Sequence, residues 1–62
     1  LKPDPAIYKL LLDRYHLNAT DCLFIDDVAK NADAARAIGM HAHHFTDTEG
    51  LTKELRRHGF PV

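Results

Sequence analysis

The chain has 62 residues, of which 45% are hydrophobic and 27% charged, and its formal net charge is −1. This length allows one globular unit at most, and a unit of this size buries only roughly 60% of its unfolded surface. The balanced charge gives no basic stripe, and no apolar run is long enough to span a membrane, so we expect neither nucleic acid nor membrane as a partner.

The single cysteine, Cys22, cannot form an internal disulfide, and we expect it to be a small buried hydrophobic residue. An unpaired thiol is typical of a cytoplasmic protein. The sequence does not begin with Met, and we therefore expect a fragment.

The first helix is predicted over residues 5–15. Asp4 suits the N-cap and Pro5 the first helical position. Apolar residues recur at helical spacing along this stretch and form a wide stripe, so both of its flanks should be buried. His16 follows where a helix often ends on a left-handed residue, a conformation that His tolerates.

Two strands and two further helices follow. Residues 22–25 form an apolar run that predicts a buried strand, and the alanine-rich residues 29–38 predict a slim helix that Gly39 ends. Residues 41–45 predict the second strand. Thr46 and Glu49 have capping-box spacing and predict the start of a third helix.

The element order is helix, strand, helix, strand, helix. Strands that alternate with helices predict an α/β fold with two parallel strands and a right-handed crossover. We expect one partial domain over residues 1–62, with a partial Rossmann-like core. At least one edge of the strand pair has no sequence to cover it, which leaves self-association through that edge possible.

Asp26 and Asp27 stand directly after the first predicted strand. In open α/β sheets, ligands bind at the carboxyl ends of the strands. Two neighbouring carboxylates repel each other when both are ionised, unless a cation lies between them, and Mg²⁺ prefers such oxygen ligands. The alternative is that Asp27 caps the next helix and Asp26 is a solvated loop acid.

Three histidines, His41, His43 and His44, lie in the second predicted strand. His41 and His43 alternate onto one face, an arrangement that can chelate zinc. A structural zinc site needs four ligands, and the only thiol lies on another strand. We therefore expect a polar strand face without metal.

Several of these motifs occur together in the haloacid dehalogenase-like (HAD) hydrolase superfamily, and the chain resembles its small phosphatases over nearly its whole length. The resemblance rests on a lysine before a proline-rich helix start and on paired acids after a strand, namely Lys2-Pro3-Asp4-Pro5 with Ile7-Tyr8, and Leu23-Phe24-Ile25-Asp26-Asp27 with Asn31, Ala35 and Gly39-Met40.

The resemblance implies a phosphatase that acts on a small phosphorylated metabolite through an aspartyl-phosphate. By that resemblance, Lys2 contacts the substrate phosphate and the nucleophile. Asp26 and Asp27 hold Mg²⁺, with Asp27 favoured as the direct ligand and Asp26 acting directly or through another group. Asn31 is a further candidate ligand, at a position where many relatives carry another acid.

The chain departs from the family pattern because it contains no nucleophile motif. None of the Asp residues outside the pair, at positions 4, 13, 21, 33 and 47, ends an apolar stretch. We therefore expect the C-terminal part of such an enzyme, inactive alone and completed by an N-terminal part that supplies the nucleophile. The alternatives are a Mg²⁺-binding receiver-like signalling module, a metal-free dehalogenase and a non-catalytic fragment.

Overall fold

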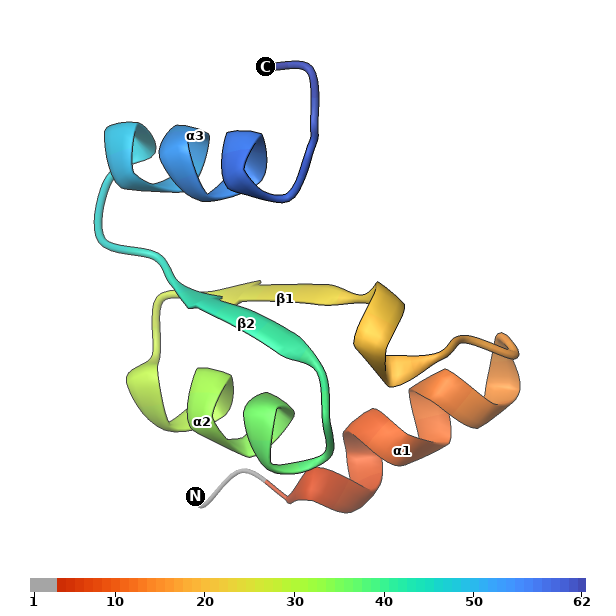
Figure 1. Ribbon diagram of the computed structural model, residues 1–62. Coiled ribbons are helices and arrows are strands. Elements are labelled where there is room, and N and C mark those ends of the chain that lie inside the picture. The colour runs from red at the N-terminus through yellow and green to blue at the C-terminus, as the bar shows by residue number, and fades with distance from the viewer. Residues whose placement is uncertain (1–3) are drawn as a thin grey trace.

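A two-stranded parallel sheet lies between helices on both of its faces (Figure 1). The computed structural model describes residues 4–62. In chain order, the elements are α1 (Pro5–Arg14), a 3₁₀ turn (Ala19–Asp21), β1 (Leu23–Asp26), α2 (Ala29–Ala37), β2 (His41–His44) and α3 (Thr48–Arg57). The predicted α/β class, element order and parallel pairing are therefore confirmed.

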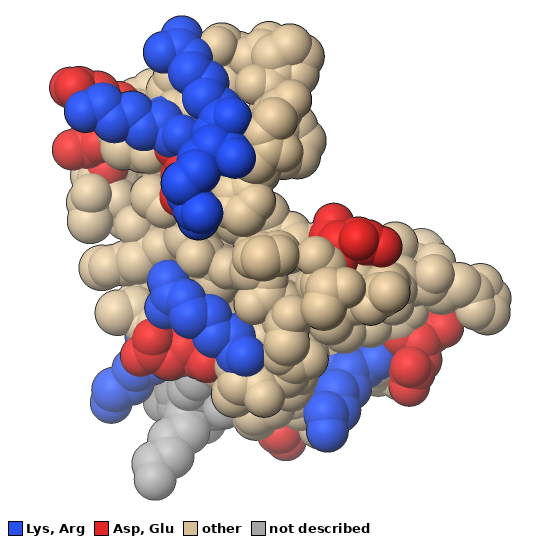
Figure 2. All heavy atoms as spheres, viewed as in Figure 1, with Lys and Arg blue, Asp and Glu red and all other residues tan. Residues whose placement is uncertain are grey.

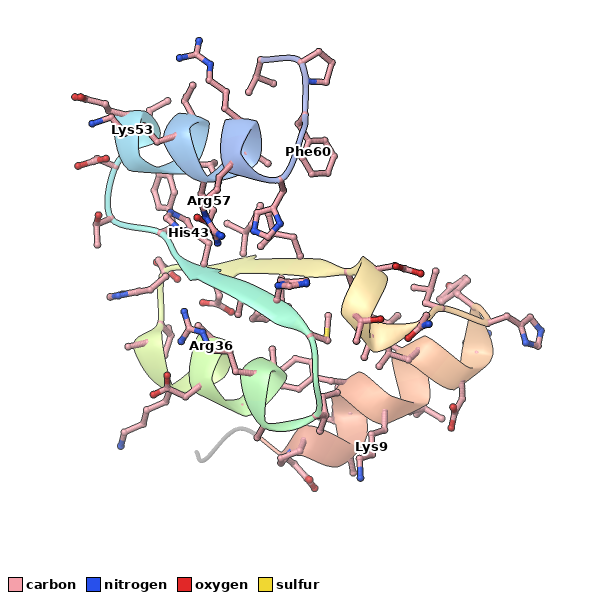
Figure 3. All side chains as sticks on the ribbon, in the orientation of Figure 1. Lys9, Arg36, His43, Lys53, Arg57 and Phe60 are labelled. Carbon is pink, nitrogen blue, oxygen red and sulfur yellow. The ribbon has the colours of Figure 1, made fainter. Side chains whose placement is uncertain are left out.

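The register of the two strands determines what each face of the sheet presents. Leu23 pairs with His41 and Asp26 with His44, so the strands end level with each other. Phe24 and Ala42 join the core on the side of α1 and α2. Successive side chains alternate between faces, and His43 accordingly points toward α3 (Figure 3).

The start and end of α1 follow the sequence prediction closely. The Asp4 carboxylate accepts a hydrogen bond from the Ala6 N–H at 2.9 Å, with Pro5 in the first turn. Tyr15 is the C-cap, and His16 adopts a left-handed φ of 54°. The helix therefore ends one residue earlier than predicted.

The apolar stripe of α1 is buried on one side only. Leu12 is buried, and the Tyr8 ring meets Phe24 edge to face with centroids 4.9 Å apart. Ile7 and Leu10 remain 66% and 67% exposed. The expectation that both flanks are buried is therefore wrong for the part of the chain that the structure describes.

The slim helix α2 packs directly on the sheet. Ala32 and Ala35 are fully buried, because a methyl side chain lets the helix backbone approach the strands closely. Arg36 adds a polar link by donating to the Ala42 carbonyl at 3.1 Å (Figure 3). Gly39 follows the helix with φ +94°, in the left-handed position predicted for it.

The cap of α3 differs from the predicted one. Asp47, not Thr46, is the N-cap, and its carboxylate accepts from the Gly50 N–H at 2.6 Å. Glu49 instead lies 3.4 Å from the Lys53 ammonium group. The helix therefore starts one residue later than the capping-box spacing indicates, since a carboxylate is the stronger acceptor for the free N–H groups of the first turn.

No helix within residues 4–62 is both long enough and apolar enough to cross a membrane.

Candidate functional site

The paired acids lie where the carboxyl ends of the two strands meet. Asp26 is the last residue of β1, and His44, its partner in the register, is the last residue of β2. The Phe45 N–H continues the ladder by donating to the Asp26 carbonyl at 2.7 Å. The chain then turns through Asp27 and Val28 into α2, so both acids stand at the sheet edge where α/β proteins bind ligands.

The Asp26 carboxylate is held by two donors from the turn and the helix that follow it. Its Oδ1 accepts from the Val28 N–H at 2.8 Å, and its Oδ2 accepts from the Asn31 side-chain amide at 3.0 Å. These bonds lower the pKa of Asp26 below its usual value. The bond from the Val28 N–H is the larger cause, and the bond from Asn31 is the next largest. Asp26 is therefore ionised at neutral pH.

Asp27 is exposed and does not cap α2. The N-cap is Val28, which makes no side-chain capping bond. The alternative that Asp27 caps the helix is therefore wrong. The reason is that β1 runs one residue further than predicted, so the Val28 N–H falls within reach of the Asp26 carboxylate instead.

His44 is a site residue that the sequence reasoning did not assign. Its Nε2 lies 3.0 Å from the Asp27 carbonyl oxygen. His44 and Asp26 are opposite each other in the register, and this pairing brings the imidazole to the turn. The sequence placed His44 in the second strand, but only the register could reveal its neighbour.

The oxygen atoms at this edge suit a hard divalent cation. Mg²⁺ binds through one or two carboxylates and keeps water or phosphate oxygens in its other positions, and Asp26 and Asp27 provide such a pair. Asn31 uses its amide nitrogen toward Asp26, so its amide oxygen points elsewhere. Among residues 4–62, no group of three or more His, Cys, Asp or Glu side chains is arranged to hold a metal ion.

Lys2 lies outside the described residues. Its role as the phosphate-contacting lysine stays a prediction.

The three strand histidines point to different faces of the sheet. The His41 ring contacts the His58 ring at the end of α3, with centroids 5.0 Å apart. The Nε2 atom of His43 is buried and has no hydrogen-bond partner among residues 4–62. His44 faces the opposite side, beside Asp27. The three side chains therefore do not converge on one point.

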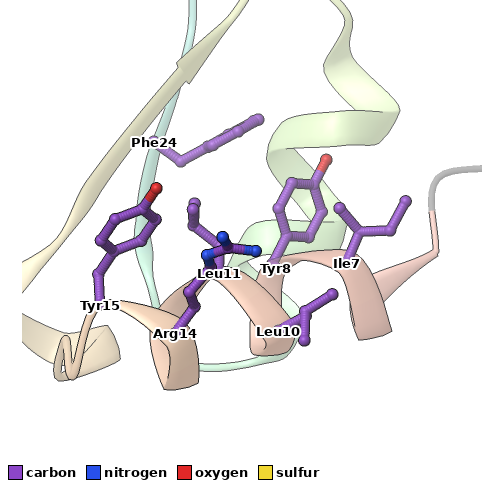
Figure 4. A pocket seen from close by; sticks show the side chains of 7 residues that line it. All are labelled: Ile7, Tyr8, Leu10, Leu11, Arg14, Tyr15 and Phe24. Atoms are coloured by element: carbon purple, nitrogen blue, oxygen red, sulfur yellow. The ribbon is translucent and has the colours of Figure 1, made fainter.

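A separate apolar groove of about 400 Å³ runs along α1. Its wall consists of apolar and aromatic side chains of α1 with Phe24 from β1, and Arg14 supplies its one charge (Figure 4). None of the described residues that line it is an acid, so the groove is distinct from the acid pair. Elsewhere, basic side chains gather over α3, where Arg56 and Arg57 occupy the last turn (Figure 2).

Known proteins resemble the chain over most of its length. No family model matches it. It is 37% identical over 62 residues to acyl-CoA dehydrogenase family member 10 of Mus musculus, covering 98% of the chain and 6% of that protein. It is 38% identical over 56 residues to the sesquiterpene phosphatase astK of Aspergillus oryzae, covering 90% of the chain and 29% of that protein. It is 38% identical over 53 residues to phosphatase MT3486 of Mycobacterium tuberculosis, covering 86% of the chain and 24% of that protein.

The chain thus spans less than a third of the length of each of these relatives. Matches that cover 86% or more of so short a chain cannot avoid its centre, where β1, the acid pair, α2 and β2 lie. The stretches matched in the two phosphatases therefore include the strand-helix-strand unit and the positions of its two acids. Together with the fold of this unit, these matches show that the chain belongs to the haloacid dehalogenase-like hydrolase superfamily.

Proposed function

We propose that this chain forms part of a Mg²⁺-dependent phosphatase that hydrolyses a small phosphate ester. The observation that carries the proposal is the acid pair at the carboxyl end of β1, with Asp26 held ionised and Asp27 exposed beside it. The similarity to proteins named as phosphatases supports the reaction class.

The two acids take different parts in this proposal. Asp27 is exposed and serves as the direct metal ligand. Both oxygens of Asp26 already accept hydrogen bonds, so it contributes negative charge and further lone pairs. Asn31 orients Asp26 through its amide nitrogen, and its amide oxygen is the third candidate ligand. When bound, Mg²⁺ would neutralise charge on the phosphoryl oxygens and orient them.

The nucleophile must come from another part of the protein. The other Asp residues that the structure describes cap helices or lie within helical elements, and none ends a strand, as seen for Asp4, Asp13, Asp21, Asp33 and Asp47. We propose that a preceding part of the same enzyme provides an Asp that forms the aspartyl-phosphate, and that Lys2 contacts the transferred phosphate.

A receiver-like signalling module is less well supported. Such a module would need a second acid at the end of another strand, and β2 ends at His44. We also propose a cytoplasmic location, which the free thiol of Cys22 favours.

The test is substitution of Asp27 in the full-length protein. Asp27→Asn keeps the side-chain shape but removes one negative charge from the metal site. We expect Mg²⁺-dependent turnover of a generic aryl phosphate to fall by roughly a hundredfold or more, since losing even an indirect partner of a metal costs about 10–100-fold.

Asp33→Asn is the matched control. It makes the same change on α2, where Asp33 pairs with Arg36 at 3.0 Å and takes no part in the acid pair. An Asp27→Asn enzyme as active as the control would show that Asp27 is not a ligand.

A further inference from the structure

The peptide unit that joins Asp27 to Val28 is hydrogen-bonded at both of its polar ends. Its N–H belongs to Val28 and donates to the Asp26 carboxylate at 2.8 Å. Its carbonyl belongs to Asp27 and lies 3.0 Å from His44 Nε2. A carbonyl oxygen can only accept a hydrogen bond, so His44 must carry its proton on Nε2.

Holding this peptide plane restricts the direction of the Asp27 side chain. The plane fixes the backbone rotation between the Cα and carbonyl carbon of Asp27, and the carboxylate projects from that same Cα. Without the imidazole, the exposed carbonyl would be free to turn toward water and the plane would be held only through the Val28 N–H. The turn would then sample more orientations of Asp27.

The strand register builds this contact into the fold. His44 is paired with Asp26 and lies on the same face of the sheet, while the Phe45 N–H anchors the next position to the Asp26 carbonyl at 2.7 Å. The imidazole therefore reaches the turn from a strand and not from a loop. Side chains on regular elements hold a partner more accurately than those on loops.

We propose that His44 is a positioning residue that orients Asp27 for metal binding through the Asp27 carbonyl. This inference rests on the proposed function, because it assumes that Asp27 binds the metal. To hold the Asp27 carbonyl, the residue at the end of β2 must present an N–H donor, neutral or positively charged, at the place where His44 Nε2 lies.

The first test uses the full-length protein without metal and needs no activity. The hydrogen bond from His44 to the Asp27 carbonyl predicts that the ¹⁵N shifts of His44 report a proton on Nε2. It also predicts that His44→Ala speeds amide hydrogen exchange at Val28. His44→Gln should restore slow exchange, because the Gln amide nitrogen can take the place of Nε2. Unchanged Val28 exchange in His44→Ala would overturn the proposal.

The second test measures Mg²⁺ binding by calorimetry. We expect His44→Ala to weaken binding about tenfold, at the lower end of the range for groups that orient a ligand. His44→Gln should stay within about twofold of the wild type by the same reasoning, whereas a purely structural role would not distinguish the two variants at matched folding. His41→Gln is the control, because His41 lies on the other face against His58.

The outcomes separate this inference from the proposed function. If the wild-type protein binds no Mg²⁺, the proposed function is wrong and the inference falls with it. If the wild type binds Mg²⁺ and folded His44→Ala binds it equally well, only the inference is wrong. A KM for the phosphate ester that stays unchanged at saturating Mg²⁺, together with the weakened metal affinity, would support it.

Discussion

The Asp26 carboxylate depends on two donors that differ in how easily they can be removed. The Val28 N–H belongs to the backbone and persists in every substitution of Val28 except Val28→Pro, whereas the Asn31 amide can be deleted by a side-chain substitution. Deleting the Asn31 side chain therefore changes the arrangement of the acid pair without changing its negative charge.

Asn31→Ala should raise the pKa of Asp26 toward its usual value without reaching it, because the bond from the Val28 N–H, the larger cause of the lowered pKa, remains. NMR titration of the Asp26 carboxyl carbon measures this change. Activity should fall far less than in Asp27→Asn, since no negative charge is lost. Asn18→Ala is the control, because the amide oxygen of Asn18 accepts a hydrogen bond from the Thr20 hydroxyl and not from the acid pair. An Asp26 titration identical in Asn31→Ala and wild type would contradict the assigned cause.

Glu54 near the end of α3 is the other acid whose pKa is lowered, and its shift is large. The Arg57 guanidinium donates to both of its oxygens, at 3.0 and 2.9 Å, and His58 approaches at 3.2 Å. The hydrogen bonds from Arg57 are the main cause that lowers the pKa of Glu54 from 4.5 to about 2.

A lowered pKa in the folded state stabilises the fold above the unfolded pKa, and the stabilisation disappears as the pH falls through the folded pKa. The free energy of unfolding should therefore decline between pH 4.5 and about 2 in the wild type. Glu54→Gln should lose this part of the decline and be less stable at neutral pH by at most about 1 kcal/mol, because the Arg57 partner is exposed and water screens the pair. Urea unfolding at several pH values tests this, with Glu49→Gln as the control at the more open pair with Lys53.

At the scale of elements, the helix ends show which sequence signals are unambiguous. Pro5 and Gly39 each permit few alternatives, and both occupy the positions predicted for them. Thr46 and Asp47 are adjacent and both suit an N-cap, so spacing alone could not choose between them. The choice depends on where the chain leaves β2, which is a tertiary property.

Asp47→Ala should therefore cost about 1 kcal/mol of stability through the lost cap, while Thr46→Ala should be close to neutral. The Asp47 carboxylate accepts from the Gly50 N–H at 2.6 Å, and alanine has no acceptor to replace it. Thermal or urea unfolding of the two single variants measures the difference. Equal losses would show that Thr46 shares the cap.

At the scale of the whole molecule, the sequence could predict that helices pack on the sheet, but not which apolar side chains of those helices would be buried. The helical pattern of α1 identifies an apolar stripe, yet a pattern cannot say whether a partner exists, and Ile7 and Leu10 are in fact exposed. The acid pair was predictable because Asp26 and Asp27 follow an apolar strand directly. His44 was not, because its contact with Asp27 depends on a register between residues 17 positions apart.

We expect the 62-residue chain alone to hydrolyse no phosphate ester and to bind Mg²⁺ weakly. No described Asp ends a strand other than the acid pair, so no phosphoenzyme can form, and two carboxylates leave most coordination to water. The measurement is turnover of an aryl phosphate with and without Mg²⁺, after circular dichroism has shown that the chain is folded. Metal-dependent turnover would mean that the nucleophile lies within these residues.

The pairing of β1 with β2 also bears on the order of events during synthesis. Leu23 and His41 are 18 positions apart, and the segment between them contains little besides α2. Closing so short a segment costs less chain entropy than closing a longer one would. The ribosome therefore needs to release the chain only to His44 before the unit that carries the acid pair can assemble, whereas α3 must wait for residues still to be added.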